Sequence, residues 1–463
     1  MKRKLKMGKY IGNRSFYSRV LKLAIPIMIQ SGITNFVNML DNVMVGKIGT
    51  IEMTGVAITN QLIFVFNLCI FGAVSGAGIF GAQYFGKKDV DGLRYTFRFK
   101  LISSVVLSVL GILIFIFGGK ALISLYLQSD DSVTQLDATM GYAWDYLKII
   151  LIGLIPYGIA QGYASSLREC DNSMPPMVAG GVAVLVNLAL NWVLIFGHLG
   201  FAPMGVKGAA IATVISRFVE LAIISIWTFA IRGKMQFIVG AFRSLYVPGS
   251  LVKQIFIKGM PLMVNETLWS AGKAALSQCY STRSLDAVAA FNIAATFYDV
   301  FAVVFLSMGS AIGIIIGQLL GNEEFDNARD NARKLITFSV FTGVICGGLF
   351  FLCAAFIPEI YNTEDSVKLL ATEFMRIWAI LMPAEAFVNG AYFTIRSGGK
   401  VLVTILFDCC FMWGVMWSVA FVIANFTSLG IIPLFAIAEG LAVLKAVLGY
   451  IFVKKGIWVR KIV

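Results

Sequence analysis

The sequence predicts an all-α integral membrane protein, with twelve transmembrane helices arranged as two pseudo-symmetric six-helix bundles. Of its 463 residues, 58% are hydrophobic and only 14% are charged, and the mean hydropathy is +0.83. A soluble protein of this size carries about 25% charged residues. Apolar stretches of about 20 residues, each long enough to cross a bilayer, recur along the whole chain. Two parts of the chain also match each other in sequence, which predicts the two bundles.

Twelve apolar stretches mark the expected helices and leave little chain for a soluble domain. In order, they cover residues 20–44, 55–82, 96–118, 143–166, 175–197, 208–231, 254–280, 287–318, 335–357, 371–395, 401–424 and 432–453. Before the first stretch, MKRKLKMGKY resembles the basic region of a signal peptide. The stretch itself is long and has no A-x-A-like cleavage site, so we expect it to be retained as the first helix.

A sequence repeat relates the early helices to the later ones. Pro26 in AIPIMIQ and Pro261 in GMPLMVN are 235 residues apart, and at that offset residues 75–98 match residues 310–333. Seven glycine or polar identities share this register: Ser75/Ser310, Gly78/Gly313, Gln83/Gln318, Gly86/Gly321, Asp91/Asp326, Arg94/Arg329 and Arg98/Arg333. Such a series is not expected by chance, so the repeat is the first guide to the architecture.

The repeat divides the chain into two lobes of six helices, 1–235 and 236–463. GYASSLR (162–168) and GAYFTIR (390–396) extend the match into the fourth helix of each lobe. Six is an even number, so both lobes begin on the same side of the membrane and the repeat is parallel. Parallel repeats are typical of transporters that open alternately to each side.

The basic residues predict the orientation of the chain. The net charge is +13, and 28 of the 38 Lys and Arg residues lie on the side of the chain termini, against seven on the opposite side. Positive loops stay in the cytoplasm, so we expect a multi-pass protein of the plasma membrane with both termini cytoplasmic. Because membrane topology accounts for this excess of Lys and Arg, we expect no nucleic-acid partner.

The sequence contains few residues typical of a catalytic or metal site. His198 is its one histidine, its seven cysteines form no C-x-x-C pair, and neither H-E-x-x-H nor G-x-S-x-G occurs. A zinc site needs several His or Cys ligands, and proton-transfer chemistry needs acid–base groups. We therefore expect no enzyme and no cofactor, and we expect a monomer in the bilayer.

Polar residues inside the first lobe mark a candidate ion site. Asp41 lies in TNFVNMLDNVMVG, within the first apolar helix, where a charge costs about 2.5–3.5 kcal/mol. Asn187 and Asn191 are four residues apart and share one face of the fifth helix, while Thr213 lies in the sixth. These oxygens suit Na⁺, or Asp41 carries a proton, because desolvation favours the neutral carboxyl. The alternative is a polar cluster that only joins helices.

The second lobe contains its own acidic residues within apolar helices. They are Glu266, Asp299, Glu385 and Asp408, in the seventh, eighth, tenth and eleventh helices. Each is a candidate for substrate binding or proton coupling, and each has a structural alternative. For Glu266 the structural alternative is a pair with Lys273, two turns along the same helix face. We interpret a further set as structural, with Arg217 and Glu220 pairing with each other or with Glu439 and Lys445.

These features resemble the multidrug and toxic compound extrusion (MATE) transporters. The resemblance rests on twelve segments in two parallel halves, on the LDNVMVGKIG run at Asp41, on NLALNWVLIFG in the fifth helix and on GAAIAT in the sixth. It is closer to the NorM-like pattern, because Asn191 stands where another branch has Asp. Glu385 replaces the Asp that is usual in NorM-like proteins.

The resemblance implies a function and a set of site residues. It implies two lobes forming a V that opens to one side at a time and exchanges organic cations for Na⁺ or H⁺. It places the cation site of the first lobe at Asp41, Asn187, Asn191 and Thr213. It places acidic positions of the second lobe at Glu266 and Glu385, and Asp408 resembles an Asp common in the eleventh helix of bacterial members.

We therefore expect a Na⁺- or H⁺-coupled antiporter that exports lipophilic, mostly cationic drugs or toxic metabolites. The main alternative is a flippase for lipid-linked sugars or polysaccharide precursors, which tends to have a cationic cavity, whereas the deep charges here are mainly acidic. A channel and an intramembrane enzyme are the remaining alternatives. The two-half design favours alternating access over a channel.

Overall fold

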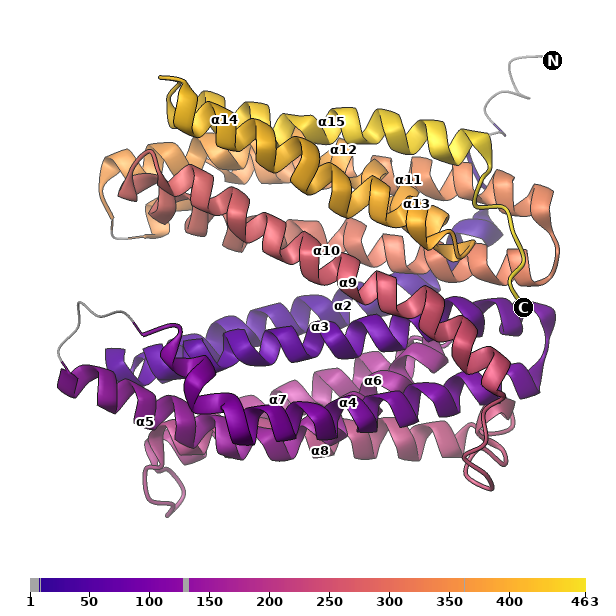
Figure 1. Cartoon of the computed structure of the whole chain (residues 1–463), viewed down its shortest axis with the longest axis horizontal. Helices are drawn as coiled ribbons and strands as arrows, with labels where there is room; N and C mark the ends of the chain where they lie inside the picture. Colours follow the sequence, from indigo (N-terminus) through magenta and orange to yellow (C-terminus); the bar gives the residue numbers. More distant parts are fainter. Residues whose placement is uncertain (1–7, 9, 128–132, 362) are drawn as a thin grey trace. The chain divides into compact units, whose positions relative to one another are not determined.

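In a computed structural model that describes residues 8, 10–127, 133–361 and 363–463, all regular secondary structure is helical (Figure 1). The α-helices are α2 (Arg14–Gly46), α3 (Thr50–Lys87), α4 (Val90–Ser124), α5 (Val133–Ile150), α6 (Leu154–Glu169), α7 (Met174–Phe196), α8 (Gly205–Ala230), α9 (Gly249–Ser281), α10 (Leu285–Gly321), α11 (Phe325–Cys353), α12 (Asp365–Ser397), α13 (Val401–Ile405), α14 (Ser418–Phe426) and α15 (Ile431–Lys455). Short 3₁₀ turns are η1 (Leu151–Gly153), η2 (Gln236–Ile238) and η3 (Pro358–Ile360), and π-helical turns are η4 (Leu406–Cys410) and η5 (Met412–Trp417).

The expected membrane segments coincide with these helices. The fourth segment comprises α5, η1 and α6, and the eleventh comprises α13, η4, η5 and α14. In the described part of the chain, ten helical stretches have the length and apolar composition of membrane spans. The other two segments are α9 and α12, which carry more charged residues, with Glu266 and Lys273 among them in α9 and Glu385 and Arg396 among them in α12. The predicted all-α membrane fold with twelve transmembrane helices is confirmed.

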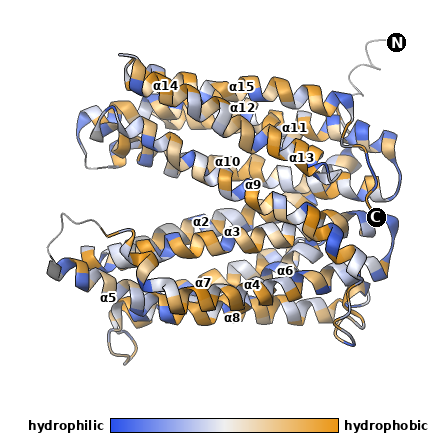
Figure 2. Cartoon of the chain, viewed as in Figure 1, coloured by the Kyte–Doolittle hydropathy of each residue, from blue (hydrophilic) through white to orange (hydrophobic). Residues whose placement is uncertain are grey.

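Hydrophobic residues predominate along the helices (Figure 2), and many large apolar side chains are exposed. Phe117, Phe426 and Leu402 are 85%, 76% and 76% exposed, and many other large apolar side chains are also exposed. A soluble protein rarely exposes such continuous apolar surface, because water opposes it. The hydrocarbon chains of a bilayer cover it without that cost.

The chain divides into two compact units, each of which we describe by itself. The amino-terminal unit comprises Ile29–Gly81 and Asp89–Gly259, and the carboxy-terminal unit comprises Met260–Val463 together with Met1–Met28 and Ala82–Lys88. Each unit is therefore discontinuous in sequence, whereas the lobes expected from the repeat are continuous. The division at 235/236 stays a prediction.

Polar contacts join the helices inside the amino-terminal unit. The Thr59 hydroxyl on α3 donates to the Ala143 carbonyl of α5 at 3.0 Å, and Ser108 on α4 donates to the Leu154 carbonyl of α6 at 3.1 Å. Lys100 on α4 is fully buried and donates to both Glu169 carboxylate oxygens of α6 at 2.6 Å. Hydrogen bonds of this kind hold membrane helices together because no water competes for the partners.

Two residue pairs of the repeat meet in the carboxy-terminal unit. A Cβ on Gly86 would overlap the backbone of Gln318, and a Cβ on Gly321 would overlap the backbone of Gln83. The contacts are thus reciprocal between the end of α3 and the end of α10. Only glycine allows two helix backbones to approach this closely.

The end of the chain packs beside this crossing. Gln83 donates to the Ser397 and Arg460 carbonyls at 3.1 and 3.3 Å and accepts from the Ile462 amide at 2.8 Å. Trp458 is only 1% exposed, and its indole N–H donates to the Val453 carbonyl at 3.1 Å. Residues 456–463 are therefore an integral part of this unit.

Candidate functional site

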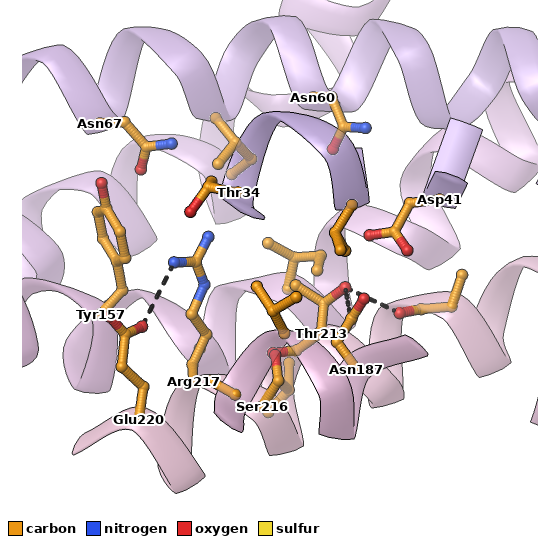
Figure 3. A pocket seen from close by; sticks show the side chains of 18 of the residues that line it. Thr34, Asp41, Asn60, Asn67, Tyr157, Asn187, Thr213, Ser216, Arg217 and Glu220 are labelled. Atoms are coloured by element: carbon orange, nitrogen blue, oxygen red, sulfur yellow. Dashed lines mark hydrogen bonds and ion pairs between the residues drawn. The ribbon is translucent and has the colours of Figure 1, made fainter. Parts of the chain in front are cut away.

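A cavity of about 510 Å³ opens within the amino-terminal unit (Figure 3). Helices α2, α3, α5, α6, α7 and α8 and the turn η1 all contribute to its wall. Its lining mixes apolar residues such as Val37, Ile63 and Phe64 with carboxamides such as Asn60 and Asn67. Small-molecule sites have this size and this mixture, in which apolar surface contributes affinity and a few polar groups fix orientation.

The four predicted residues of the first lobe come together at one end of this cavity. Asn191 donates to Asp41 Oδ1 at 2.7 Å, and Asn187 lies 3.2 Å from Asn191 and 3.3 Å from the Thr213 hydroxyl. Asn187 and Asn191 are 5% and 1% exposed. The i, i+4 spacing on α7 places both amides on the face that meets α2, as the sequence predicts.

The side-chain amide of Asn187 lies between the Asp41 carboxylate and the Thr213 hydroxyl, and its orientation fixes which hydrogen bonds it makes to them. One of its terminal atoms lies 3.0 Å from each Asp41 carboxylate oxygen. If that atom is the nitrogen, it donates to an ionised Asp41 and the Asn187 oxygen accepts from Thr213. If it is the oxygen, it faces the carboxylate directly, and a proton or a cation is needed between the two acceptors.

Arg217 and Glu220 on α8 lie at the other end of the cavity, with Tyr157 of α6 (Figure 3). The Arg217 guanidinium carbon is 4.3 Å from the centre of the Tyr157 ring. Its Nη1 is 3.9 Å from a Glu220 oxygen, so the predicted Arg217–Glu220 ion pair is present but loose. Glu439 and Lys445, the other expected partners, instead pair with Lys273 and Asp408.

The predicted pairing of Glu266 with Lys273 is wrong. The Tyr392 hydroxyl donates to Glu266 at 2.7 Å, and Arg396 Nη1 lies 3.4 Å from the same oxygen. Lys273 Nζ lies 3.6 Å from Glu439 of α15. Residues seven apart on a helix share a face, but two turns separate them by about 10 Å along the axis, and partners on neighbouring helices are nearer.

Asp408 belongs to the same polar network as Glu266. Lys445 of α15 donates to Asp408 at 2.7 Å, and Asn265 donates to its other oxygen at 3.0 Å. Asn265 also lies 3.5 Å from the Tyr392 hydroxyl, which links Asp408 to Glu266. Asp408 lies in the π-helical turn η4. Sequence reasoning did not single out Asn265 or Tyr392, although Asn265 precedes Glu266 and Tyr392 lies one helical turn before Arg396.

Glu385 and Asp299 stay outside this network. Glu385 is half-buried on α12 and Asp299 is exposed on α10. Among the described side chains, neither makes a hydrogen bond or an ion pair. The structure thus brings together Glu266 and Asp408 and leaves the other two acidic candidates apart, while the roles of all four stay predictions.

A model of the MatE family matches residues 26–193 and again residues 261–422. The chain belongs to the MatE family. The two matches begin at Pro26 and Pro261, the prolines that open the sequence repeat. One family model therefore describes both parts of the chain.

Curated relatives with multidrug-resistance names extend over nearly the whole MatE chain. The probable multidrug resistance protein NorM of Thermotoga maritima is 25% identical over 453 residues, which cover 96% of this chain and 93% of the relative. The probable multidrug resistance protein YoeA of Bacillus subtilis is 25% identical over 415 residues, 88% of this chain and 87% of the relative.

Solved structures show the same MatE fold. The Vibrio cholerae MATE transporter VcmN in its bent form has a TM-score of 0.84 at 17% identity, covering 96% of this chain and 97% of that one. A MOP superfamily transporter from Pyrococcus furiosus has a TM-score of 0.85 at 18% identity, covering 96% of each chain. This likeness establishes the fold.

Proposed function

We propose that this MatE protein is a cation-coupled antiporter that exports lipophilic, mostly cationic small molecules by alternating access. The observation that carries the proposal is the joining of Asp41, Asn187, Asn191 and Thr213 at one end of a drug-sized cavity. The names of the curated relatives support multidrug export as the activity. An acidic group in a mainly apolar cavity attracts organic cations, and the apolar wall binds their rings.

Coupling follows from competition at Asp41. A carboxylate held by the two carboxamides accepts one positive charge, from Na⁺, from H⁺ or from the cationic substrate. Entry of the coupling ion from outside then favours release of the substrate to the outside. One charge moving across 100 mV contributes about 2.3 kcal/mol, roughly a 50-fold concentration ratio. That is sufficient for useful export with one coupling ion.

Both Na⁺ and H⁺ are compatible with this cluster. Na⁺ accepts carboxylate, carboxamide and hydroxyl oxygens, all of which are present. A proton needs only Asp41 and the oxygen of Asn187 as an acceptor. No cofactor takes part in either version, and the protein acts without covalent chemistry on its substrate.

Transport by the purified protein in proteoliposomes tests the proposal. Ethidium efflux is measured with an imposed Na⁺ gradient, with an imposed pH gradient, with both and with neither. We expect efflux to accelerate severalfold with one of the two gradients. Equal efflux in all four conditions contradicts cation coupling.

The same proposal places the protein in the plasma membrane as a monomer, with both termini in the cytoplasm. Its support is the excess of Lys and Arg in the connections on the side of the termini. Substrate then enters the cavity from the cytoplasm and leaves to the outside.

A further inference from the structure

Arg217 is a second charged group in the cavity, at the end opposite Asp41 (Figure 3). It follows Thr213 by one turn of α8, so both side chains face the cavity from the same helix. Figure 3 shows the guanidinium beside Tyr157, with a dashed line that marks its long ion pair with Glu220. A cation in the middle of a membrane protein is costly and needs a reason.

The guanidinium donors of Arg217 have no fixed acceptor among the described residues. Its nearest printed partner, Glu220, is 3.9 Å away, beyond hydrogen-bond distance, and the Arg217 side chain is 32% exposed. Arg98 in the same unit is held differently, with hydrogen bonds to the carbonyls of Ala241, Gly240 and Tyr246 at 2.7, 2.9 and 3.1 Å. Arg168 donates to Gln30 at 2.6 Å. The structural arginines of this unit are thus bonded to protein acceptors, whereas Arg217 presents its donors to the cavity.

We propose that Arg217 binds a carboxylate of the transported compound, so that the cavity selects zwitterionic amphiphiles. The cationic group of such a compound lies toward Asp41 and its carboxylate lies at Arg217. The inference rests on the proposed function and adds a substrate class to it. It also reassigns Arg217, which the sequence analysis interpreted as structural.

The chemistry of the guanidinium favours this ligand. Its planar fork matches a carboxylate with two parallel hydrogen bonds, which are charge-assisted and directional. Tyr157 covers one face of the fork at 4.3 Å and holds it without using its N–H donors. Glu220 balances the charge of Arg217 only loosely, so a ligand carboxylate with better geometry displaces that interaction.

Two dyes that differ only at a carboxyl group test the inference. Rhodamine 110 has a free carboxylate and is a zwitterion, while rhodamine 123 is its methyl ester and a cation. Binding to the purified full-length protein is measured by fluorescence polarisation for wild type, Arg217→Gln and Arg217→Lys. We expect Arg217→Gln to weaken rhodamine 110 binding about tenfold and to change rhodamine 123 binding less than about twofold. Arg217→Lys keeps the charge and loses the fork, so its rhodamine 110 affinity should be intermediate.

Two further variants complete the design. Glu220→Gln removes the competing carboxylate and should tighten rhodamine 110 binding severalfold. Arg232→Gln changes an exposed arginine just after α8, outside the cavity, and should leave both dyes unaffected. The Tm of each variant is measured in parallel. If Arg217→Gln fails to fold, its Tm is lowered and it loses binding of both dyes equally. The affinity of Glu220→Gln for rhodamine 110 then decides the inference by itself.

The outcomes separate this inference from the proposed function. Equal weakening of both dyes in folded Arg217→Gln, or tight wild-type binding of rhodamine 123 without rhodamine 110, overturns the role of Arg217 and leaves cation export standing. Failure of the wild type to bind either dye contradicts both proposals.

Discussion

At the residue scale, the proposed coupling rests on the charge of Asp41, which a coupling ion would neutralise. We predict that Asp41→Asn abolishes gradient-driven ethidium export, because Asn keeps the size and hydrogen bonding of the side chain but binds neither a proton nor Na⁺. Export by the reconstituted variant is measured with imposed Na⁺ and pH gradients. Asp145→Asn is the matched control, because Asp145 pairs with Lys148 and Lys207 outside the cavity. Wild-type export by Asp41→Asn would return Asp41 to a structural role.

The partner of Glu266 gives a second prediction at this scale. Arg396 is 5% exposed and lies 3.4 Å from Glu266, so replacing either partner removes an ion pair between two largely buried charges. Free energies of unfolding of Glu266→Gln, Arg396→Gln and the double variant should show a coupling of about 1–3 kcal/mol. The same cycle for Glu266 and Lys273 should be additive within about 0.5 kcal/mol. Coupling in the second cycle and none in the first contradicts the observed pairing.

Sequence reasoning reached the residues of the Asp41 cluster because each is polar within an apolar helix and the spacing on α7 fixes a common face. It failed for Lys273 for a physical reason. Helical periodicity compares residues on one helix, whereas Glu439 lies on α15, 166 positions later in the chain. Which neighbouring helix supplies the partner depends on lateral packing, and no local pattern encodes that.

At the element scale, glycine controls the crossing of α3 and α10. We predict that Gly321→Ala or Gly86→Ala lowers stability by roughly 1–3 kcal/mol or more, because the added methyl meets backbone that has no room to move. Gly348→Ala on α11 is the control, since a Cβ there meets open space. Alanine is favoured over glycine inside a helix by about 1 kcal/mol, so this control should be neutral or slightly stabilising. The test compares the Tm of each variant in detergent. Equal Tm values for all three variants contradict the close crossing of α3 and α10.

Hydropathy predicts where the helices lie but not their internal irregularities. The fourth segment contains the 3₁₀ turn η1, and the eleventh contains the π-helical turns η4 and η5 around Asp408. Apolar composition is the same in α, 3₁₀ and π geometry, so the sequence alone does not distinguish them. We attribute these 3₁₀ and π-helical turns to tertiary packing, which helix propensity does not describe.

At the scale of the whole molecule, topology is the property that the basic residues predict. With the seven native cysteines replaced, a membrane-impermeant thiol reagent applied to intact cells should label Leu199→Cys and Glu364→Cys. It should not label Lys88→Cys or Asp326→Cys until the membrane is permeabilised. All four positions are exposed, so accessibility within the protein does not limit the reaction. Labelling of all four in intact cells contradicts the parallel repeat.

The repeat was visible in the sequence, yet it did not indicate which residues form each compact unit. Matching Gln83 with Gln318 shows that two positions are alike, and it says nothing of what either touches. The structure places the last turn of α3 with Met260–Val463, because Gln83 and Gly86 meet α10 and the end of the chain.

The hydrogen bond between Gln83 and the Ile462 amide sets an order of events during synthesis. The two residues are 379 positions apart. A ribosome adds roughly 5–20 residues per second, so Gln83 precedes its partner by roughly 20–80 s. During that interval the helices that follow are made, while the side chain of Gln83 lacks the Arg460 carbonyl and the Ile462 amide. Assembly at this end of the carboxy-terminal unit is therefore completed only after residues 456–463 have been made, and these residues act as its closing step.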